Sequence, residues 1–386
     1  MSSAELAVGV VLPASGTGDR FSCQTPKQFA CLLDKPIFFH TVMAFYRFDW
    51  VQNIVIIVST EYIDRVTAMV DCFKDKVKVV LGSNTRHRSI RVGVQALLHV
   101  QPVPDVVVIH DVVRPFFDEE VVKTIVKNAF VHGAAGVTRP LVSTVIQGDE
   151  NDMLTASLDR NLYRASEMPQ AFKYGVIKEA YEKADENDLD FGTECLFLAL
   201  KHCQTPAKLI PGPDSLWKIT YKKDLYAAEG IMKETGICVC IQSVTGSASE
   251  IVLQCLEHHI SEKGLSCKRV SEVSSDFNTY VFVHTEKSDI MTMLETMSQE
   301  VCDCHRRHKY EIVKPCVIHV YAGNLCDTET EREFSETITK LSKDQCSVLW
   351  YGAVCQSTCG RLGKMVASLC WTREDSFSGQ TFVLHS

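Results

Sequence analysis

Small residues and cations follow the first apolar run of the chain. This run, residues 6–12, ends at Pro13 and leads into Ala14-Ser15-Gly16-Thr17-Gly18, after which come Arg20 and Lys27. Without bulky side chains, backbone N–H groups can approach an anion closely. The two cations suit a triphosphate and the charge that grows on its α-phosphorus under attack. The segment is neither a Walker A loop nor a dinucleotide-binding fingerprint. It is either a triphosphate-binding loop or an ordinary turn with two surface cations.

A second polar group follows another short apolar run. Gly82-Ser83-Asn84-Thr85-Arg86-His87-Arg88-Ser89 comes directly after residues 77–81. Gly and Ser where a loop enters a helix can present backbone groups to the edge of a nucleobase, and Ser89 can form a hydrogen bond at the helix start. The alternative interpretation is an N-capped helix with a basic first turn.

A third group closes a strand-like run. His110-Asp111-Val112-Val113-Arg114-Pro115 follows residues 105–109. An acid at the carboxyl end of a strand, beside a nucleotide loop, predicts a ligand for Mg²⁺ or substrate. A solvated Asp–Arg pair is the alternative.

These groups are positioned by alternating strand and helix signals. Apolar runs predict strands, and residues spaced for one face predict helices between them. The predicted strands are residues 6–12, 54–58, 77–81 and 105–109, and the predicted helices are 35–48, 62–73, 88–99 and 119–132. A βαβαβαβ series predicts a Rossmann-like, mostly parallel sheet, in which ligands bind at the carboxyl ends of the strands. The three polar groups are therefore expected to meet.

A second α/β series begins after Thr235-Gly236. Its predicted strands are residues 237–242, 279–284 and 316–321, and its predicted helices are 249–263, 289–300 and 328–341. We therefore expect two domains, 1–235 and a smaller α/β domain over 236–386. The length of 386 residues agrees with two domains.

The second domain carries two weaker motifs. Val244-Thr245-Gly246-Ser247-Ala248-Ser249 is similar to the NAD(P)-binding first turn of short-chain dehydrogenases, but it has one Gly, and we find no convincing Tyr-x-x-x-Lys pair. Cys302, Cys304, His305 and His308 could ligate zinc, but no second Cys-x-x-Cys accompanies them. We expect a degenerate Rossmann-like domain without cofactor, whose role the sequence leaves unknown.

Composition excludes several classes of function. Hydrophobic residues make up 46%, enough for packed cores, and the net charge of −8 disfavours nucleic acid as a partner. The apolar runs are strand-sized, so we expect no membrane span. No basic segment precedes residues 8–12, and the 17 cysteines are odd in number. These features predict free thiols in the cytosol rather than a secreted disulfide framework.

Taken together, the motifs resemble one family. Pro-Ala-x-Gly-x-Gly-x-Arg, Pro-Lys-Gln, Gly with Arg-x-x-Ser, and His-Asp-x-x-Arg-Pro resemble the IspD-like cytidylyltransferases. The similarity covers roughly residues 6–230 and continues through Asp159-Arg160-Asn161, Pro169-Gln170, Thr193-Glu194 and residues 214–218. That family joins CTP to a polyol phosphate and releases pyrophosphate.

The resemblance implies a role for each matching residue. The implied CTP-binding residues are Ala14, Ser15, Gly16 and Gly18 for phosphates and sugar, Gly82, Ser83 and Ser89 for cytosine, and Asp111 for ribose and metal. The implied catalytic cations are Arg20, Lys27 and Lys218. The implied acceptor-side residues are Arg114, Thr144 and Arg160, and the implied Mg²⁺ ligands are Asp111 and Asp214.

The resemblance also implies a homodimer. The segment from about residue 139 to 160 would be an arm exchanged between two subunits, so that Arg160 serves the partner's site. Ser83-Asn84-Thr85 stands where the bacterial isoprenoid enzymes have an acid, and Asp214 lies four residues before Lys218 instead of three. The first departure is closer to relatives that use ribitol 5-phosphate.

The extra length resembles the eukaryotic branch of the family. The implied reaction converts CTP and D-ribitol 5-phosphate to CDP-ribitol and pyrophosphate, supplying ribitol phosphate for protein O-mannosyl glycans, notably on α-dystroglycan. The alternatives are 2-C-methyl-D-erythritol 4-phosphate as acceptor, or a catalytically inactive scaffold. Arg20, Lys27, Asp111 and Lys218 are all present, which favours an enzyme.

Overall fold

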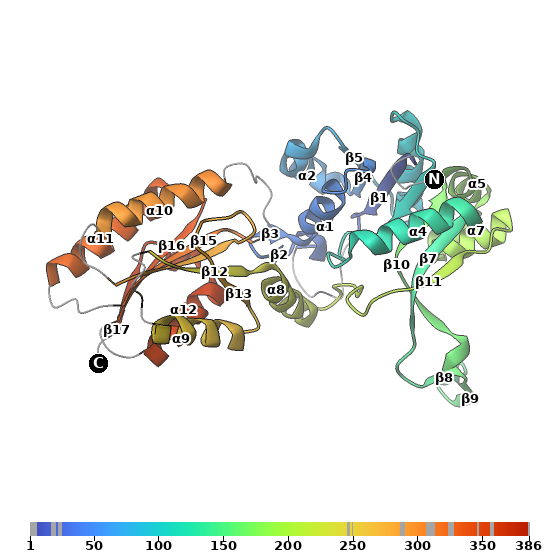
Figure 1. Ribbon diagram of the computed structural model, residues 1–386. Coiled ribbons are helices and arrows are strands. Elements are labelled where there is room, and N and C mark those ends of the chain that lie inside the picture. The colour runs from blue at the N-terminus through green and yellow to red at the C-terminus, as the bar shows by residue number, and fades with distance from the viewer. Residues whose placement is uncertain are drawn as a thin grey trace. The chain divides into compact units, whose positions relative to one another are not determined.

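The computed structural model describes residues 6–16, 21, 25–244, 248, 250–285, 290–305, 313–322, 328–345, 347–355 and 359–384. The chain divides into two compact units, Met1–Leu225 and Tyr226–Ser386. Each unit has its own sheet (Figure 1). The division falls inside helix α8 (Lys222–Gly236), whereas the sequence places the boundary at Gly236.

The first unit is built on a seven-stranded sheet. Its spatial order is β11-β7-β10-β6-β1-β4-β5. The strands are β1 (Val8–Pro13), β4 (Val51–Val58), β5 (Val77–Leu81), β6 (Val106–Ile109), β7 (Ala134–Pro140), β10 (Arg164–Lys173) and β11 (Lys208–Pro211). β1 pairs in parallel with β4 and β6, and β4 with β5, whereas β10 runs antiparallel to its neighbours β6 and β7. The expectation of a mostly parallel sheet is confirmed.

The order of the parallel strands fixes where a ligand can bind. The chain passes from β1 outward to β4 and β5 and then returns to the other side of β1 as β6. Strand order therefore reverses at β1, and the crevice at such a reversal, outside the carboxyl ends of the strands, is the usual ligand site of open α/β sheets.

Apolar residues on both faces of the strands explain the burial of this sheet. Val10, Val11 and Leu12 of β1 are all fully buried, as is expected of a parallel strand covered by helices. The helices are α1 (Ile37–Tyr46), α2 (Ile63–Val70), α3 (Arg86–Ala96), α4 (Glu119–His132), α5 (Tyr174–Lys183), α6 (Glu186–Phe191) and α7 (Cys195–Cys203). α3, α5 and α7 share one hydrophobic core with the central strands, and α4 packs on β7 and β10.

Two hairpins complete the first unit. The small one joins β2 (Cys31–Leu32) and β3 (Lys35–Pro36). The other joins β8 (Val145–Gly148) and β9 (Leu154–Leu158), and it projects from the ends of β7 and β10 as an arm (Figure 1). Apolar side chains on and beside this arm are exposed, namely Val142, Ile146, Met153, Leu154 and Leu162.

The second unit is a six-stranded sheet in which every pair of neighbours is parallel. Its order is β13-β12-β14-β15-β16-β17. The strands are β12 (Cys238–Ser243), β13 (Ser266–Arg269), β14 (Thr279–His284), β15 (Cys316–Ala322), β16 (Leu349–Cys355) and β17 (Thr381–Leu384), and the helices are α9 (Glu250–Glu262), α10 (Ile290–His305), α11 (Thr328–Asp344) and α12 (Cys359–Thr372). This arrangement confirms the second α/β series.

The core of the second unit contains a buried polar group. α10 and α11 pack on one side of the sheet with Phe282, Phe334 and Trp350. Within this core, His284 Nε2 lies 3.1 Å from His319 Nδ1, and His319 Nε2 lies 3.3 Å from Ser298 Oγ.

Two features of the sequence motifs in the second unit lie outside the described residues. They are Thr245-Gly246-Ser247 and Ser249 of the dehydrogenase-like turn, and His308 of the Cys/His group. No helix in the described part of the chain is long and apolar enough to cross a bilayer.

Candidate active site

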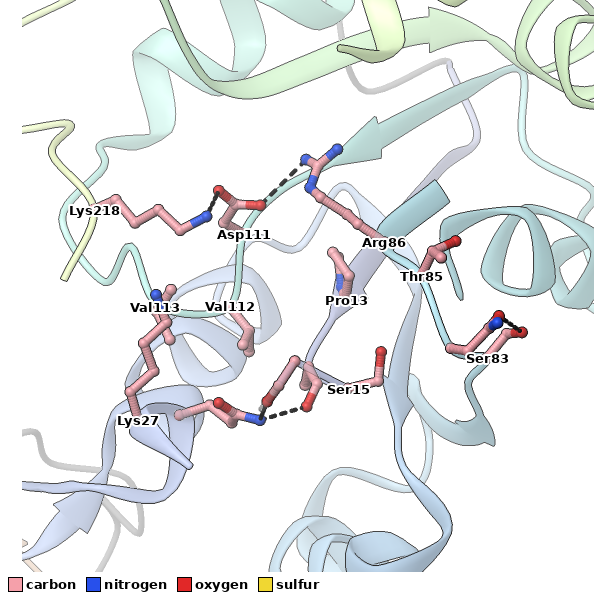
Figure 2. Close-up of a pocket in the computed structure, with 14 residues that line it drawn as sticks. Pro13, Ser15, Lys27, Ser83, Thr85, Arg86, Asp111, Val112, Val113 and Lys218 are labelled. Atoms are coloured by element: carbon pink, nitrogen blue, oxygen red, sulfur yellow. Dashed lines mark hydrogen bonds and ion pairs between the residues drawn. The ribbon is translucent and has the colours of Figure 1, made fainter. Parts of the chain in front are cut away.

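A pocket lies where three loops of the first unit meet, after β1, β5 and β6 (Figure 2). It is lined by Pro13, Ala14, Ser15, Gly16, Lys27, Gln28, Ser83, Asn84, Thr85, Arg86, Asp111, Val112, Val113 and Lys218. The sheet therefore brings the three sequence motifs together at the carboxyl ends of its strands. Of the CTP-binding residues implied by the resemblance, Ala14, Ser15, Gly16, Ser83 and Asp111 line this pocket.

The loop after β1 is held by Gln28, which also lines the pocket. Its Nε2 donates to the carbonyl oxygens of Ala14 and Gly16, at 2.8 Å each. Neighbouring Lys27 donates from Nζ to the carbonyl oxygen of Ile219 at 3.2 Å, and its side chain faces the pocket (Figure 2). The predicted site residues Gly18 and Arg20 lie outside the described residues.

The loop after β5 packs directly against the first loop. A Cβ on Gly82 would lie 2.9 Å from Ile57 Cγ2 and 3.1 Å from Ser15 Cβ, so only Gly permits this approach. Ser89, buried in α3, joins both loops, because its Oγ lies 2.9 Å from Ser15 Oγ and accepts from the Ser83 amide at 3.0 Å. Gly82 and Ser89 thus shape the wall of the pocket from behind.

Asp111 forms ion pairs with three cationic side chains beside the pocket. Its Oδ1 accepts from Arg86 Nη2 at 3.2 Å, and its Oδ2 accepts from Lys218 Nζ at 3.0 Å and from Arg114 Nε at 3.2 Å. Burial would raise the pKa of Asp111, but Arg86, Lys218 and Arg114 outweigh it and hold that pKa well below its usual range. The carboxylate is therefore ionised throughout the neutral range, and the surplus of positive charge suits an anionic ligand.

A row of alternating charges continues from Asp111 away from the pocket. Arg114, also bonded to Asp111, donates from Nη1 to Glu167 Oε2. Glu167 Oε1 in turn accepts from Arg139 at 3.0 Å (Nε) and 2.5 Å (Nη2). Arg139 Nη1 lies 3.9 Å from Asp214 Oδ1. Arg114 and Glu167 are buried, whereas the side chain of Asp214 is fully exposed.

Among the described residues, six predicted site residues do not line the pocket of their own chain. Gly82 and Ser89 lie behind its wall, and Arg114 is buried between Asp111 and Glu167. The other three lie farther along the chain. Thr144 is exposed between β7 and β8. Arg160 is exposed after β9 and donates from Nη1 to the carbonyl oxygen of Val142. Both belong to the arm region. Asp214 lies in a turn after β11.

These residues do not fit a ready-made protein site for a divalent cation. Mg²⁺ prefers oxygen ligands, and Asp111 offers them, but both of its oxygens already face cations. Asp214 lies beyond Arg139 in the row of charges and does not line the pocket. We therefore derive no chemical step from a metal held by these two carboxylates.

Sequence reasoning assigned no role to four residues of this region. Arg86 and Gln28 belong to the motifs Arg-x-x-Ser and Pro-Lys-Gln, so the motif spacing could have identified them as site residues. Glu167 and Arg139 gave no such signal, because their importance depends on the pairing of β7 with β10.

Comparisons with known proteins identify the family of this chain. A family model described as IspD, 2-C-methyl-D-erythritol 4-phosphate cytidylyltransferase, matches residues 8–234. The D-ribitol-5-phosphate cytidylyltransferase of Xenopus tropicalis is 44% identical over 89% of this chain and 87% of its own length. The human protein of the same name is 47% identical over 61% of this chain and 54% of its own length.

Two more distant similarities cover a smaller part of the chain. The 2-C-methyl-D-erythritol 4-phosphate cytidylyltransferase of Syntrophus aciditrophicus is 30% identical over 59% of this chain and 96% of its own length. Among solved structures, 4-diphosphocytidyl-2C-methyl-D-erythritol synthase from Anaerococcus prevotii shares the fold with a TM-score of 0.50 and 21% identity. That match covers 59% of this chain and 96% of the other.

Proposed function

Because the chain belongs to the IspD family of cytidylyltransferases, we propose that it transfers the cytidylyl group of CTP to D-ribitol 5-phosphate, forming CDP-ribitol and pyrophosphate. The observation that carries the proposal is the meeting of the loops after β1, β5 and β6 with Lys27, Asp111 and Lys218 in one pocket. The choice of acceptor rests on the relatives named for D-ribitol 5-phosphate, which are 44% and 47% identical to this chain.

The pocket suggests how CTP would lie. The Ala14–Gly16 backbone, Lys27 and Lys218 would bind the triphosphate, together with Arg20. Ser83, beside Gly82 and Ser89, would face the cytosine. Asp111 would face the ribose, where an ionised carboxylate can accept hydrogen bonds from hydroxyl groups. This placement puts the cations at the phosphates, where negative charge is greatest.

The proposed reaction is an in-line displacement at the α-phosphorus. A phosphate oxygen of the acceptor forms the new P–O bond, and the bond from the α-phosphorus to the bridging oxygen breaks, so that pyrophosphate leaves. A phosphate monoester is already anionic at neutral pH, so the attack needs no strong general base. Catalysis therefore consists of positioning and charge neutralisation, to which Arg20, Lys27 and Lys218 contribute.

Mg²⁺ is proposed as the cofactor, bound through the phosphates of the nucleotide. Magnesium sites in nucleotide enzymes usually combine few carboxylates with substrate phosphates and water. Both oxygens of Asp111 already pair with cationic side chains, so the phosphates of CTP are the better ligands for the ion.

A homodimer with shared sites is proposed from the arm. Thr144 and Arg160 lie in a projecting segment, and the exposed Ile146, Met153 and Leu154 beside them would be buried by a second copy. In such a dimer the partner's arm would carry the acceptor-phosphate ligand Arg160 to the pocket. Mixing Lys27→Ala with Arg160→Ala subunits tests this, since one of the two sites in a mixed dimer would be intact. No recovery of activity would contradict a shared site.

A reducing compartment such as the cytosol is proposed from the cysteines. Cys195, Cys203, Cys238, Cys240, Cys267, Cys316 and Cys370 are free thiols. Use of CDP-ribitol for protein glycans stays a prediction of the family resemblance.

Pyrophosphate release from CTP and a panel of acceptors tests the proposed function. We expect turnover with D-ribitol 5-phosphate to exceed that with erythritol phosphate and 2-C-methyl-D-erythritol 4-phosphate. A preference for 2-C-methyl-D-erythritol 4-phosphate would overturn the acceptor. Absence of turnover with every acceptor, while folding is intact, would instead favour an inactive scaffold.

A further inference from the structure

The segment that carries Lys218 has no secondary structure of its own. Residues 212–220 follow β11 without forming a helix or strand. The segment is fixed by its backbone, since Arg114 Nη1 donates to the carbonyl oxygen of Leu216 at 2.6 Å and Arg139 Nη1 donates to that of Asp214 at 3.4 Å. Two guanidinium groups thus hold the loop two and four residues before Lys218.

One carboxylate joins these two guanidinium groups. Glu167 accepts from Arg114 with one oxygen and from Arg139 with the other. It is only 7% exposed, and such a buried carboxylate is stable only when it is paired. The pairing of β10 with β7 is irregular between Ser166 and Gln170, the stretch that contains Glu167. Irregularities of this kind redirect a side chain, often beside an active site.

We propose that Glu167 and Arg139 are positioning residues that hold the Lys218 loop, and with it the Lys218 ammonium, at the α-phosphate of CTP. Glu167 orients both guanidinium groups, and these in turn bind the carbonyl oxygens of Leu216 and Asp214. The inference rests on the proposed function and assigns a role to two residues that touch neither substrate.

A direct role in binding the acceptor phosphate is the competing interpretation. Three nitrogens of Arg139 already face Glu167 and Asp214. The Glu167 carboxylate beside them would repel a phosphate. The contacts therefore favour a role in holding the loop.

A double-mutant cycle between Glu167→Gln and Lys218→Ala tests the proposal. The glutamine keeps the shape of the side chain and removes its charge. We expect Glu167→Gln to lower kcat about tenfold in the wild-type background and less than twofold in the Lys218→Ala background, because residues that act as one unit are not additive. Equal losses in both backgrounds would overturn the proposal. So would a change confined to the KM of the polyol phosphate, which would make these residues acceptor ligands.

Arg139→Gln is the second variant, since Arg139 is partly exposed and its replacement leaves the buried Glu167 bound to Arg114. We expect a loss of about threefold in kcat, again absent when Lys218 is alanine. Asp188→Asn is the matched control, because Asp188 is an equally buried carboxylate held by Lys201 and His202. It should lower the melting temperature, with no coupling to Lys218.

Binding of CTP without acceptor, measured by calorimetry, separates this inference from the proposed function. If the wild type turns over no polyol phosphate, the proposed function fails, but the same cycle can be read in the Kd for CTP. Glu167→Gln should weaken CTP binding severalfold only when Lys218 is present. Equal weakening in its absence would overturn the positioning role by itself.

Discussion

The two units share an architecture but differ in what they bury. Both are largely parallel sheets flanked by helices. Among the described residues, the first unit buries Asp111, Arg114, Glu167 and Asp188, whereas the buried polar side chains of the second are Thr279, His284, Ser298, His319 and Thr330. The second set contains no carboxylate and no guanidinium group.

This difference shows that sheets of similar topology can carry different polar side chains. Strand order reverses at β1 in the first unit and at β12 in the second. At β1, the charged residues Lys27, Asp111 and Lys218 surround the crevice. The core of the second unit holds two histidines, His284 and His319, and Ser298. Function follows these side chains, since one fold can carry many activities or none.

The largest effect is expected from Lys27→Ala, in the pocket of the first unit. Loss of one cation at the triphosphate should lower kcat by about 10² to 10³-fold, or about 3 to 4 kcal/mol, on the scale of losing one transition-state partner. Steady-state pyrophosphate release measures this loss. Ser298→Ala in the second unit serves as the control and should leave kcat unchanged. Turnover of the lysine variant within a few fold of wild type would mean that the phosphate site is elsewhere.

Acid should affect the second unit through His284. Burial lowers the pKa of His284 to about 4, and burial also lowers the pKa of its neighbour His319. Below pH 6.5 the unfolded chain binds a proton that folded His284 does not, so the free energy of unfolding falls as pH decreases towards 4, by about 3 kcal/mol.

Urea unfolding of wild type and His284→Asn at pH 7 and pH 4.5 checks this prediction. The variant should lose less stability between the two values. Identical losses would show that His284 is not responsible. The pocket should keep its charge over this range, because the pKa of Asp111 is held well below it by the neighbouring cations.

Arg160→Ala sharpens the comparison within the first unit, between pocket and arm. The arm residue should serve the acceptor, so kcat/KM for the polyol phosphate should fall by about 2 kcal/mol, roughly 30-fold. The KM for CTP should stay the same, which initial-rate measurements with each substrate varied can establish. A rise in the KM for CTP alone would assign Arg160 to the nucleotide.

Ser89→Ala should give the smallest effect. Its hydroxyl group joins the loops that carry Ser15 and Ser83. Loss of these hydrogen bonds should raise the KM for CTP severalfold, equivalent to about 1 kcal/mol. Ser298→Ala, which removes another buried hydroxyl group, is the matched control, and we expect it to leave the KM for CTP unchanged. Equal effects of the two deletions would point to general destabilisation.

The sequence was most informative where strands are apolar and helices have one apolar face. The strands at Val77–Leu81 and Thr279–His284 and the helix at Glu119–His132 have the predicted bounds. For the second half of the first unit, the sequence patterns predicted no strands or helices. Its strand Arg164–Lys173 mixes Arg, Ser, Glu and Pro with apolar residues, and such a run carries no clear period.

The site was predictable to the extent that it depends on single loops. Ser15, Ser83 and Asp111 each follow a strand directly, so topology alone brings them together. Glu167 and Arg139 come from strands that pair antiparallel with an irregular register, and no local pattern encodes that register. Their partnership became visible only in the folded sheet.

The two hydrogen bonds of Gln28 have a consequence for ionic strength. They turn the carbonyl oxygens of Ala14 and Gly16 toward the Gln28 amide. In a trans peptide the N–H points opposite to the C=O, so the amide of Ser15 is directed away from Gln28. Gln28 thus makes the carbonyl oxygen of Ala14 and the N–H of Ser15 face opposite sides of the loop, without adding a formal charge. Added electrolyte screens the attraction of exposed ammonium groups over distance, but it has little effect on short-range dipoles. The loop should therefore keep part of its preference for anions at high electrolyte concentration.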